Sequence, residues 1–217
     1  MSLIAKDKGG AQMDPIAPGV YAAVCYGVVD LGTQFNAKFN KEERKVLVQW
    51  ELPDCRAEFQ RDGQMVNLPR ATSRRYTLSL SVKAALRRDL ESWRGRKFTE
   101  KELEGFDLKA ILGAACQIQM VQETGKDGRV FSGIAAIMAL PKGAPRRKPE
   151  NPLMFFTFDE AGPNPVLPAE MPDWIRKIVC ESREWRNIGA APQPASTPAA
   201  AAARPAAPAE TSDDLPF

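Results

Sequence analysis

Residues 74–95 carry the sequence RRYTLSLSVKAALRRDLESWRG, in which the spacing of the apolar side chains changes midway. The first half alternates apolar with polar residues, which is typical of a strand with one buried face. In the second half the apolar residues recur at the spacing of a helix, at Val82, Leu86, Leu90 and Trp93. Gly95 stands where a left-handed residue commonly ends a helix. The stretch therefore predicts a strand over 74–80 that runs into a helix ending at Gly95.

Strand patterns lie on both sides of this stretch. Alternating apolar residues predict two strands before it, over 19–30 and 44–52, and two after it, over 114–123 and 129–140. Turn-forming residues predict a loop over 30–40 and a tight turn over 125–128. They also predict a long connection over 53–69 that includes Asp62-Gly63, with a short hairpin of its own as the alternative. Gly133 predicts a bulge or bend in the last strand.

The order strand, strand, strand, helix, strand, strand is that of the OB-fold, a five-stranded Greek-key barrel. The sequence thus predicts a mainly β domain over 18–145, with the helix placed between strands three and four. An α+β sandwich built from the same elements is the competing architecture. After the helix, Thr99 and Glu102 form the pattern of a capping box, which predicts a second, short helix that ends at Gly105.

The ends of the chain differ from this domain. Residues 1–17 are polar and predict a flexible arm, and 190–217 are rich in Ala and Pro and predict a disordered linker. Residues 146–189 predict an extension: a basic connector, a short strand over 153–158 and a helix that starts at Pro172. Trp174 and Trp185 are predicted to dock that helix on the barrel.

Composition limits the chemistry. The 217 residues are 44% hydrophobic and include no histidine, so the commonest general base and zinc ligand is absent. The four cysteines are scattered, which fits reduced, buried thiols. The sequence shows neither a phosphate-binding glycine loop nor metal-ligand spacing. We therefore expect no enzyme activity, no cofactor and no metal, and a cytoplasmic protein without a membrane segment.

Charge is distributed unevenly along the chain. The net charge is +3 overall, but residues 190–217 contain one Arg and three acidic residues, which leaves +5 on residues 1–189. A basic body with an acidic end suggests a polyanionic partner.

The last residues form a compact peptide ligand. Phe217 carries a ring and the terminal carboxylate, Pro216 restricts the backbone, and two acidic residues precede Leu215, namely Asp213 and Asp214. This ending resembles the acidic tip of single-stranded-DNA-binding proteins. The resemblance implies that residues 213–217 recruit replication and repair enzymes.

The body resembles the single-stranded-DNA-binding proteins of tailed bacteriophages. The segments that carry this resemblance are MSLIAKD (1–7), RKVLVQWEL (44–52), RYTLSL (75–80), KAALR (83–87), ESWRGRKFT (91–99) and LPKG (140–143). It implies a protein of the bacterial host's cytoplasm that coats single-stranded DNA during replication, recombination and repair. The usual bacterial family starts differently and has a linker richer in Gly and Gln, so its tetramer does not transfer. The sequence leaves open whether the protein forms a homo-oligomer.

A non-specific single-strand site needs cations for phosphates and aromatic faces for bases. The residues that could supply them are Phe35, Lys38, Phe39, Lys41, Lys45, Arg70, Arg74, Arg75, Tyr76, Arg96, Lys97, Lys126, Arg129 and Phe131. Tyr76 and Phe131 could equally serve the core, and Arg74 and Arg75 could be ordinary surface charge. Two other functions stay open: an adaptor whose barrel binds protein, and a metal-dependent nuclease.

Overall fold

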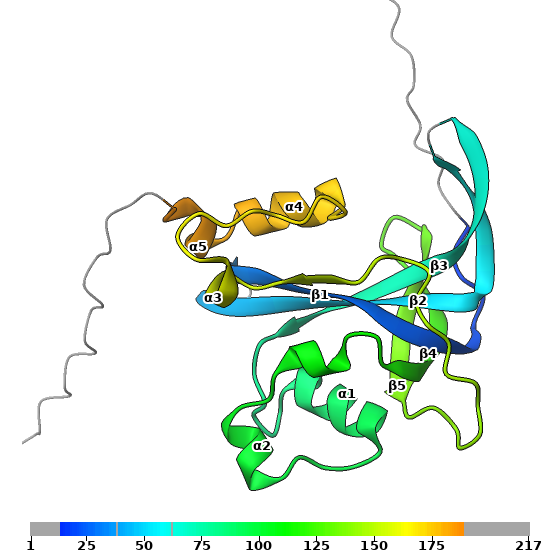
Figure 1. The fold of residues 1–217 in the computed structure, drawn as a ribbon, viewed down its shortest axis with the longest axis horizontal. Helices are drawn as coiled ribbons and strands as arrows, with labels where there is room; N and C mark the ends of the chain where they lie inside the picture. Colours follow the sequence, from blue (N-terminus) through cyan, green and yellow to red (C-terminus); the bar gives the residue numbers. More distant parts are fainter. Residues whose placement is uncertain (1–13, 38, 62, 189–217) are drawn as a thin grey trace, which may run out of the picture.

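The computed structural model describes residues 14–37, 39–61 and 63–188. Its main feature is a curled antiparallel sheet in the strand order β3-β2-β1-β4-β5 (Figure 1). The strands are β1 (Gly19–Asn36), β2 (Lys41–Arg61), β3 (Gln64–Thr77), β4 (Ala115–Thr124) and β5 (Val130–Met138). A short strand, β6 (Met154–Phe156), pairs in parallel with β1. The protein is therefore mainly β, and its five-stranded half-barrel is compatible with an OB-like barrel.

The helices cover both sides of this sheet. One group follows β3 in the chain: α1 (Ala85–Arg94), α2 (Glu100–Glu104) and the 3-10 helix η1 (Leu108–Ile111). The other group follows β6: α3 (Phe158–Ala161), α4 (Asp173–Cys180) and α5 (Arg183–Arg186). Figure 1 shows α1 and α2 on one side of β1 and β2, and α4 and α5 on the other.

The concave side of the sheet encloses the larger core. Alternating residues of β1 and β2 point inward and pack against the buried face of α1, which contributes Leu86, Leu90 and Trp93. Trp93 packs on Trp50 of β2 with ring centroids 5.8 Å apart. Trp50 is a core residue, as its place on the apolar face of its strand predicts.

The opposite side of β1 and β2 carries a second core. Val29, Leu31 and Leu47 are buried there against residues that follow β6 in the chain, including Ile175 and Val179 of α4. β1 is thus buried on both faces over much of its length. The extension over 146–188 is an integral layer of the fold.

The segment before β1 closes the gap between the edge strands β3 and β5. Ile16 is buried in the larger core, and its N–H donates to Ser132 Oγ of β5 at 2.5 Å. Arg70 of β3 donates to the carbonyl of Asp14 at 2.6 Å. Although 1–17 was predicted as a flexible arm, its last residues are held in place by these contacts.

Several predicted boundaries are wrong. β1 continues to Asn36 and β2 starts at Lys41, so the predicted loop over 30–40 shrinks to a turn. The predicted connection over 53–69 is the end of one long β2–β3 hairpin, which projects beyond the sheet (Figure 1). The register of β4 and β5 shifts next to Ala135, and Gly133 pairs regularly with Val121.

The predicted final helix is two helices. Ser182 lies between α4 and α5, and its hydroxyl accepts from Trp185 N as the N-cap of α5. Trp174 is 48% exposed, so its predicted docking role is wrong, whereas Trp185 packs against the second core. The Gly95 cap and the Thr99–Glu102 capping box form as predicted, but Val82 lies before α1 and is exposed.

Candidate nucleic-acid interface

The β1–β2 turn exposes two phenyl rings. Phe35 is 65% exposed at the end of β1, and Phe39 is 61% exposed in the turn itself. The Nζ atom of Lys41 lies 5.6 Å from the centroid of the Phe39 ring. Lys38 lies outside the described residues. Two exposed rings next to a lysine supply both kinds of contact that a single strand uses.

Lys45, by contrast, is engaged within the protein. Its Nζ atom lies 2.5 Å from a carboxylate oxygen of Glu43 and 2.7 Å from Thr77 Oγ1. Hydrogen bonds from Lys41, Lys45 and Asn36 lower the pKa of Glu43 to about 2, so this carboxylate is ionised at neutral pH. Lys41 also pairs with Glu43, at 2.6 Å, but its side chain is 57% exposed, whereas that of Lys45 is 16% exposed. Because it is largely enclosed, Lys45 is a weaker phosphate ligand than predicted.

The β4–β5 turn exposes a second group of predicted residues. Gly125 N donates to Arg129 O at 2.8 Å and closes the turn, and Gly128 takes the left-handed conformation that the turn needs. Phe131 is 48% exposed, so it is not a core residue, and Lys126 and Arg129 are exposed beside it. This turn therefore repeats the combination of ring and cation found at the β1–β2 turn.

The two turns lie at opposite ends of β1. In the register of the sheet, Gly19 pairs with Met120 near the end of β4, whereas Asn36 pairs with Lys41 at the start of β2. A single strand of nucleic acid that contacted both turns would therefore have to run along the sheet from one end of β1 to the other.

Two predicted residues on β3 serve the interior. Tyr76 is 4% exposed, and its hydroxyl donates to Asp89 of α1 at 3.0 Å. Burial and the charge of Asp89 raise its pKa above the ordinary value. Arg74 donates to Asp89 at 2.8 Å and to the carbonyl oxygen of Ile134. Tyr76 is thus no stacking platform, and Arg74 ties β3 to α1 and β5.

The two remaining arginines of β3 differ in whether contacts within the protein already engage their side chains. Arg70 holds the segment before β1, as described above, and is half-buried. Arg75 alternates with Arg74 and Tyr76 and is exposed, with no carboxylate within 4.0 Å among the described residues. Of the predicted β3 residues, Arg75 is therefore the one available to a ligand.

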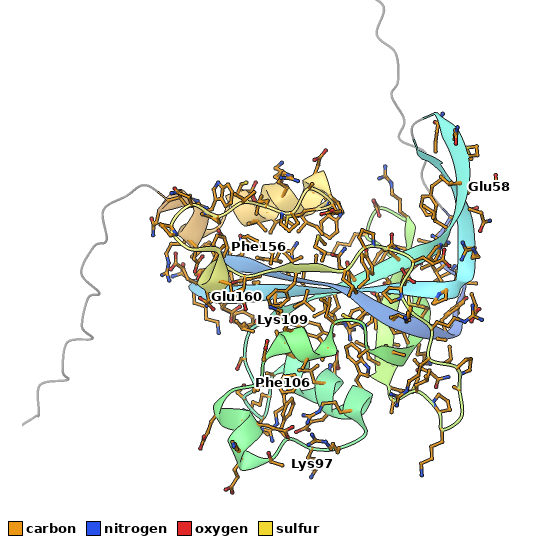
Figure 2. The ribbon with its side chains drawn as sticks, viewed as in Figure 1. Glu58, Lys97, Phe106, Lys109, Phe156 and Glu160 are labelled. Carbon is orange, nitrogen blue, oxygen red and sulfur yellow. The ribbon has the colours of Figure 1, made fainter. Side chains whose placement is uncertain are left out.

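Arg96 and Lys97 lie beyond α1, on the lobe that Figure 2 marks with Lys97 and Phe106. Arg96 donates to both carboxylate oxygens of Glu102, at 2.9 and 2.7 Å. These bonds, together with the capping bond from Thr99 N and an ion pair with Arg94, lower the pKa of Glu102 well below its usual range. Lys97 is exposed.

Arg96 also lines a groove of about 610 Å³ that the sequence did not predict. Its other basic residues are Arg94, Arg146 and Arg147. The run Arg146-Arg147-Lys148 was recognised in the sequence as a basic connector. Its position beside α1 depends on how the chain returns after β5, which no local pattern encodes.

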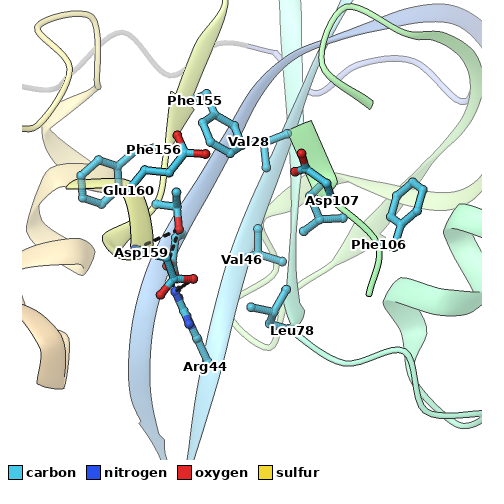
Figure 3. Close-up of a pocket in the computed structure, with 13 residues that line it drawn as sticks. Val28, Arg44, Val46, Leu78, Phe106, Asp107, Phe155, Phe156, Asp159 and Glu160 are labelled. Atoms are coloured by element: carbon cyan, nitrogen blue, oxygen red, sulfur yellow. Dashed lines mark hydrogen bonds and ion pairs between the residues drawn. The ribbon is translucent and has the colours of Figure 1, made fainter. Parts of the chain in front are cut away.

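A smaller cavity of about 240 Å³ opens at the end of the concave face (Figure 3). Its lining includes apolar residues such as Val28, Val46 and Phe155, together with the carboxylates of Asp107 and Glu160. At its rim Arg44 bridges two further carboxylates, Asp30 at 2.5 Å and Asp159 at 2.9 Å. The three charges at the rim are therefore paired with one another.

Among the described residues, no group of three or more His, Cys, Asp or Glu side chains is arranged to hold a metal ion. None of the helices in that part of the chain is both long and apolar enough to cross a membrane. The predicted tip, residues 213–217, lies outside the described residues.

Comparison with known proteins gave no match: no family model, curated protein or solved structure is similar to this chain.

Proposed function

We propose that this protein binds single-stranded DNA with little sequence preference. The observation that carries the proposal is the presence of exposed phenyl rings beside cations at two of the hairpin turns of a curled five-stranded sheet, the β1–β2 turn and the β4–β5 turn. Phe35, Phe39 and Phe131 are each about half exposed or more, although burial of a phenyl ring is strongly favourable. Stacking on bases gives such rings a role in binding. The neighbouring Lys41 and Arg129 pair with Glu43 and Asp127, but their side chains are 57% and 74% exposed and can contact phosphates.

The architecture supports the same proposal. In the OB-fold, the loops between strands one and two and between strands four and five are the ones that bind oligonucleotides. Here β3 and β5 are the edges of the half-barrel, and Arg74 joins them through Ile134. We interpret the sheet as an OB-fold whose barrel is completed by this bridge and by Ile16.

The chain ending supports a second part of the proposal. Residues 213–217 resemble the acidic tip of single-stranded-DNA-binding proteins, and the Ala/Pro-rich sequence before them has the composition of a spacer. We propose that the tip recruits enzymes of DNA replication, recombination or repair while the barrel coats the strand.

The test is fluorescence anisotropy of a labelled poly-dT oligonucleotide, titrated at several salt concentrations beside a duplex of equal length. We expect tight binding to the single strand, weaker binding to the duplex, and an affinity that falls as salt rises, because phosphate contacts release counterions. Phe35→Ala and Phe39→Ala should each weaken binding by about 5- to 150-fold, which corresponds to about 1–3 kcal/mol of lost stacking.

Trp174→Ala is the matched control, because Trp174 is an exposed aromatic residue on α4. It should leave the affinity for poly-dT unchanged. Absence of single-strand binding by the wild type would overturn the proposal. The protein would then be an adaptor, and Trp174 would be the first residue to test for protein binding.

A further inference from the structure

The 610 Å³ groove is formed by two segments that are far apart in the sequence. The first runs from the end of α1 to η1 and contributes Arg94, Arg96 and Glu102. The second runs from the end of β5 into the connector and contributes Arg146 and Arg147. The fold thus brings four guanidinium groups to one groove that contains a single carboxylate.

The two arginines of the first wall are held in position before any ligand binds. The guanidinium group of Arg94 lies against an edge-to-face pair of phenyl rings, 4.5 Å from the Phe98 centroid and 5.0 Å from the Phe106 centroid. Arg94 and Arg96 both pair with Glu102, whose position is fixed by the capping box. A cation that is already fixed loses little entropy on binding, which favours a preformed site.

One of the two arginines of the second wall has no carboxylate partner among the described residues. Arg147 pairs with Asp54 at 2.8 Å. Arg146 is exposed, and it has no carboxylate within 4.0 Å among the described residues. Because the one lining carboxylate already pairs with Arg94 and Arg96, the groove keeps a positive excess and favours an anionic ligand.

Small residues make up part of the lining of the groove, namely Ala110, Gly113, Ala114, Ala115 and Ala139. Trp93 also lines it, but the indole N–H is already donated to the Ala115 carbonyl at 3.0 Å. The site therefore combines small residues in its lining with several guanidinium donors, which match phosphate oxygens in planar, paired geometry.

We infer that this groove holds phosphate groups of a bound nucleic-acid strand. The inference rests on the proposed function and extends it, since no residue of the β1–β2 turn or the β4–β5 turn lines the groove. The strand would contact the protein through its bases at the turns and through its phosphates along the groove.

Arginine footprinting of the wild-type chain tests the inference directly. Phenylglyoxal modification is followed by mass spectrometry, with and without saturating poly-dT. We expect Arg96 and Arg146 to react at least about fivefold more slowly with the oligonucleotide bound. Arg88, whose side chain is 72% exposed on α1 and does not line the groove, should react at an unchanged rate.

A pair of charge variants gives the second readout. Removal of both cations in Arg96→Gln/Arg146→Gln should make the slope of log affinity against log salt shallower by about 1.4, since each phosphate contact on a single strand contributes about 0.7. Lys83→Gln/Lys177→Gln makes the same change of charge at two exposed positions outside the groove. This control should leave the slope unchanged.

The outcomes separate the inference from the proposed function. Binding of poly-dT without protection of Arg96 and Arg146 overturns the inference and leaves the function standing. Absence of poly-dT binding overturns both. Protection by inorganic tripolyphosphate or by polyglutamate, but not by poly-dT, also overturns it and assigns the groove to free polyphosphate or to an acidic peptide.

Discussion

Two of the four thiols are shielded by the core. Burial raises the pKa of Cys25 to about 12, an effect only partly offset by a hydrogen bond with the backbone of Gly27. Burial, and next the charge of Cys25, raises the pKa of Cys116 well above its ordinary value. Cys55 and Cys180 are only partly buried, although the sequence suggested that all four are enclosed.

We therefore expect Ellman's reagent to titrate two thiols rapidly in the native protein and four in denaturant. The reagent needs both access and a thiolate, and Cys25 and Cys116 offer neither at neutral pH. Peptide mapping of the labelled protein identifies the reactive pair. Rapid labelling of Cys25 or Cys116 without denaturant would contradict the buried positions of these residues.

Asp89 joins α1 to β3 inside the larger core. It is buried and accepts from Arg74 at 2.8 Å and from the Tyr76 hydroxyl at 3.0 Å. Asp89→Ala leaves both donors without their acceptor, so we expect the free energy of unfolding to fall by about 2–3 kcal/mol. Urea unfolding measures this loss. Arg75→Ala, at an exposed position on the same strand, should change stability by less than about 0.5 kcal/mol.

At the scale of the elements, α5 is held on β1 through one carboxylate. Glu184 accepts from Thr33 N and from Thr33 Oγ1, both at 2.6 Å. Burial by itself raises the pKa of Glu184, but the bonds from Thr33 outweigh it, and the net pKa is lowered. Glu184 therefore stabilises the fold fully above the unfolded pKa of about 4.3 and loses this contribution as the pH falls through its lower folded pKa.

The pH dependence of the free energy of unfolding separates the contribution of the Glu184–Thr33 contact from other contributions. Glu184→Gln should be less stable than the wild type at pH 7, and the difference should shrink towards zero as the pH falls below about 4. Urea midpoints of both proteins between pH 7 and pH 3 measure it. A difference that stays constant over this range would mean that the Glu184 charge does not contribute.

The presence of the strands and of α1 could be predicted from the sequence, whereas the residues at which several strands begin or end could not. Gly32 resembles a turn residue in the sequence, yet it lies within β1 beside a register shift. An added Cβ there would come within 2.5 Å of Ser182 Cβ and 2.7 Å of Glu184 Oε2. The glycine is needed because α5 packs closely against it. The sequence shows the glycine but not the partner segment about 150 residues away.

The residues of the candidate site also divide into those predictable from local sequence and those that depend on the complete fold. Exposed rings in polar turns were predictable from local sequence, and Phe35 and Phe39 lie where that reasoning placed them on the surface. For Tyr76 the sequence left core packing and base stacking equally open, because a strand pattern does not show whether the interior holds a polar partner for the hydroxyl. Asp89 of α1 is that partner. The convergence of Arg146 with Arg96 requires the complete fold.

At the scale of the whole molecule, β1 belongs to both cores. Its inward residues pack with α1, and Val29 and Leu31 pack with α4 on the other side. The extension over 146–188 therefore shares its central strand with the barrel. Neither layer can unfold without exposing an apolar face of β1 to water, which couples the two layers energetically.

We accordingly expect one cooperative unfolding transition for both cores, with protection of α1 and α4 lost at the same urea concentration. Hydrogen exchange of peptides from Ala85–Arg94 and Asp173–Cys180 measures the two midpoints in one experiment. The outer part of the β2–β3 hairpin projects beyond the sheet and should exchange at lower urea, which shows that the method resolves unequal stabilities. An earlier midpoint for α4 than for α1 would instead make the extension a separately folding layer that can detach from β1 while the barrel stays intact.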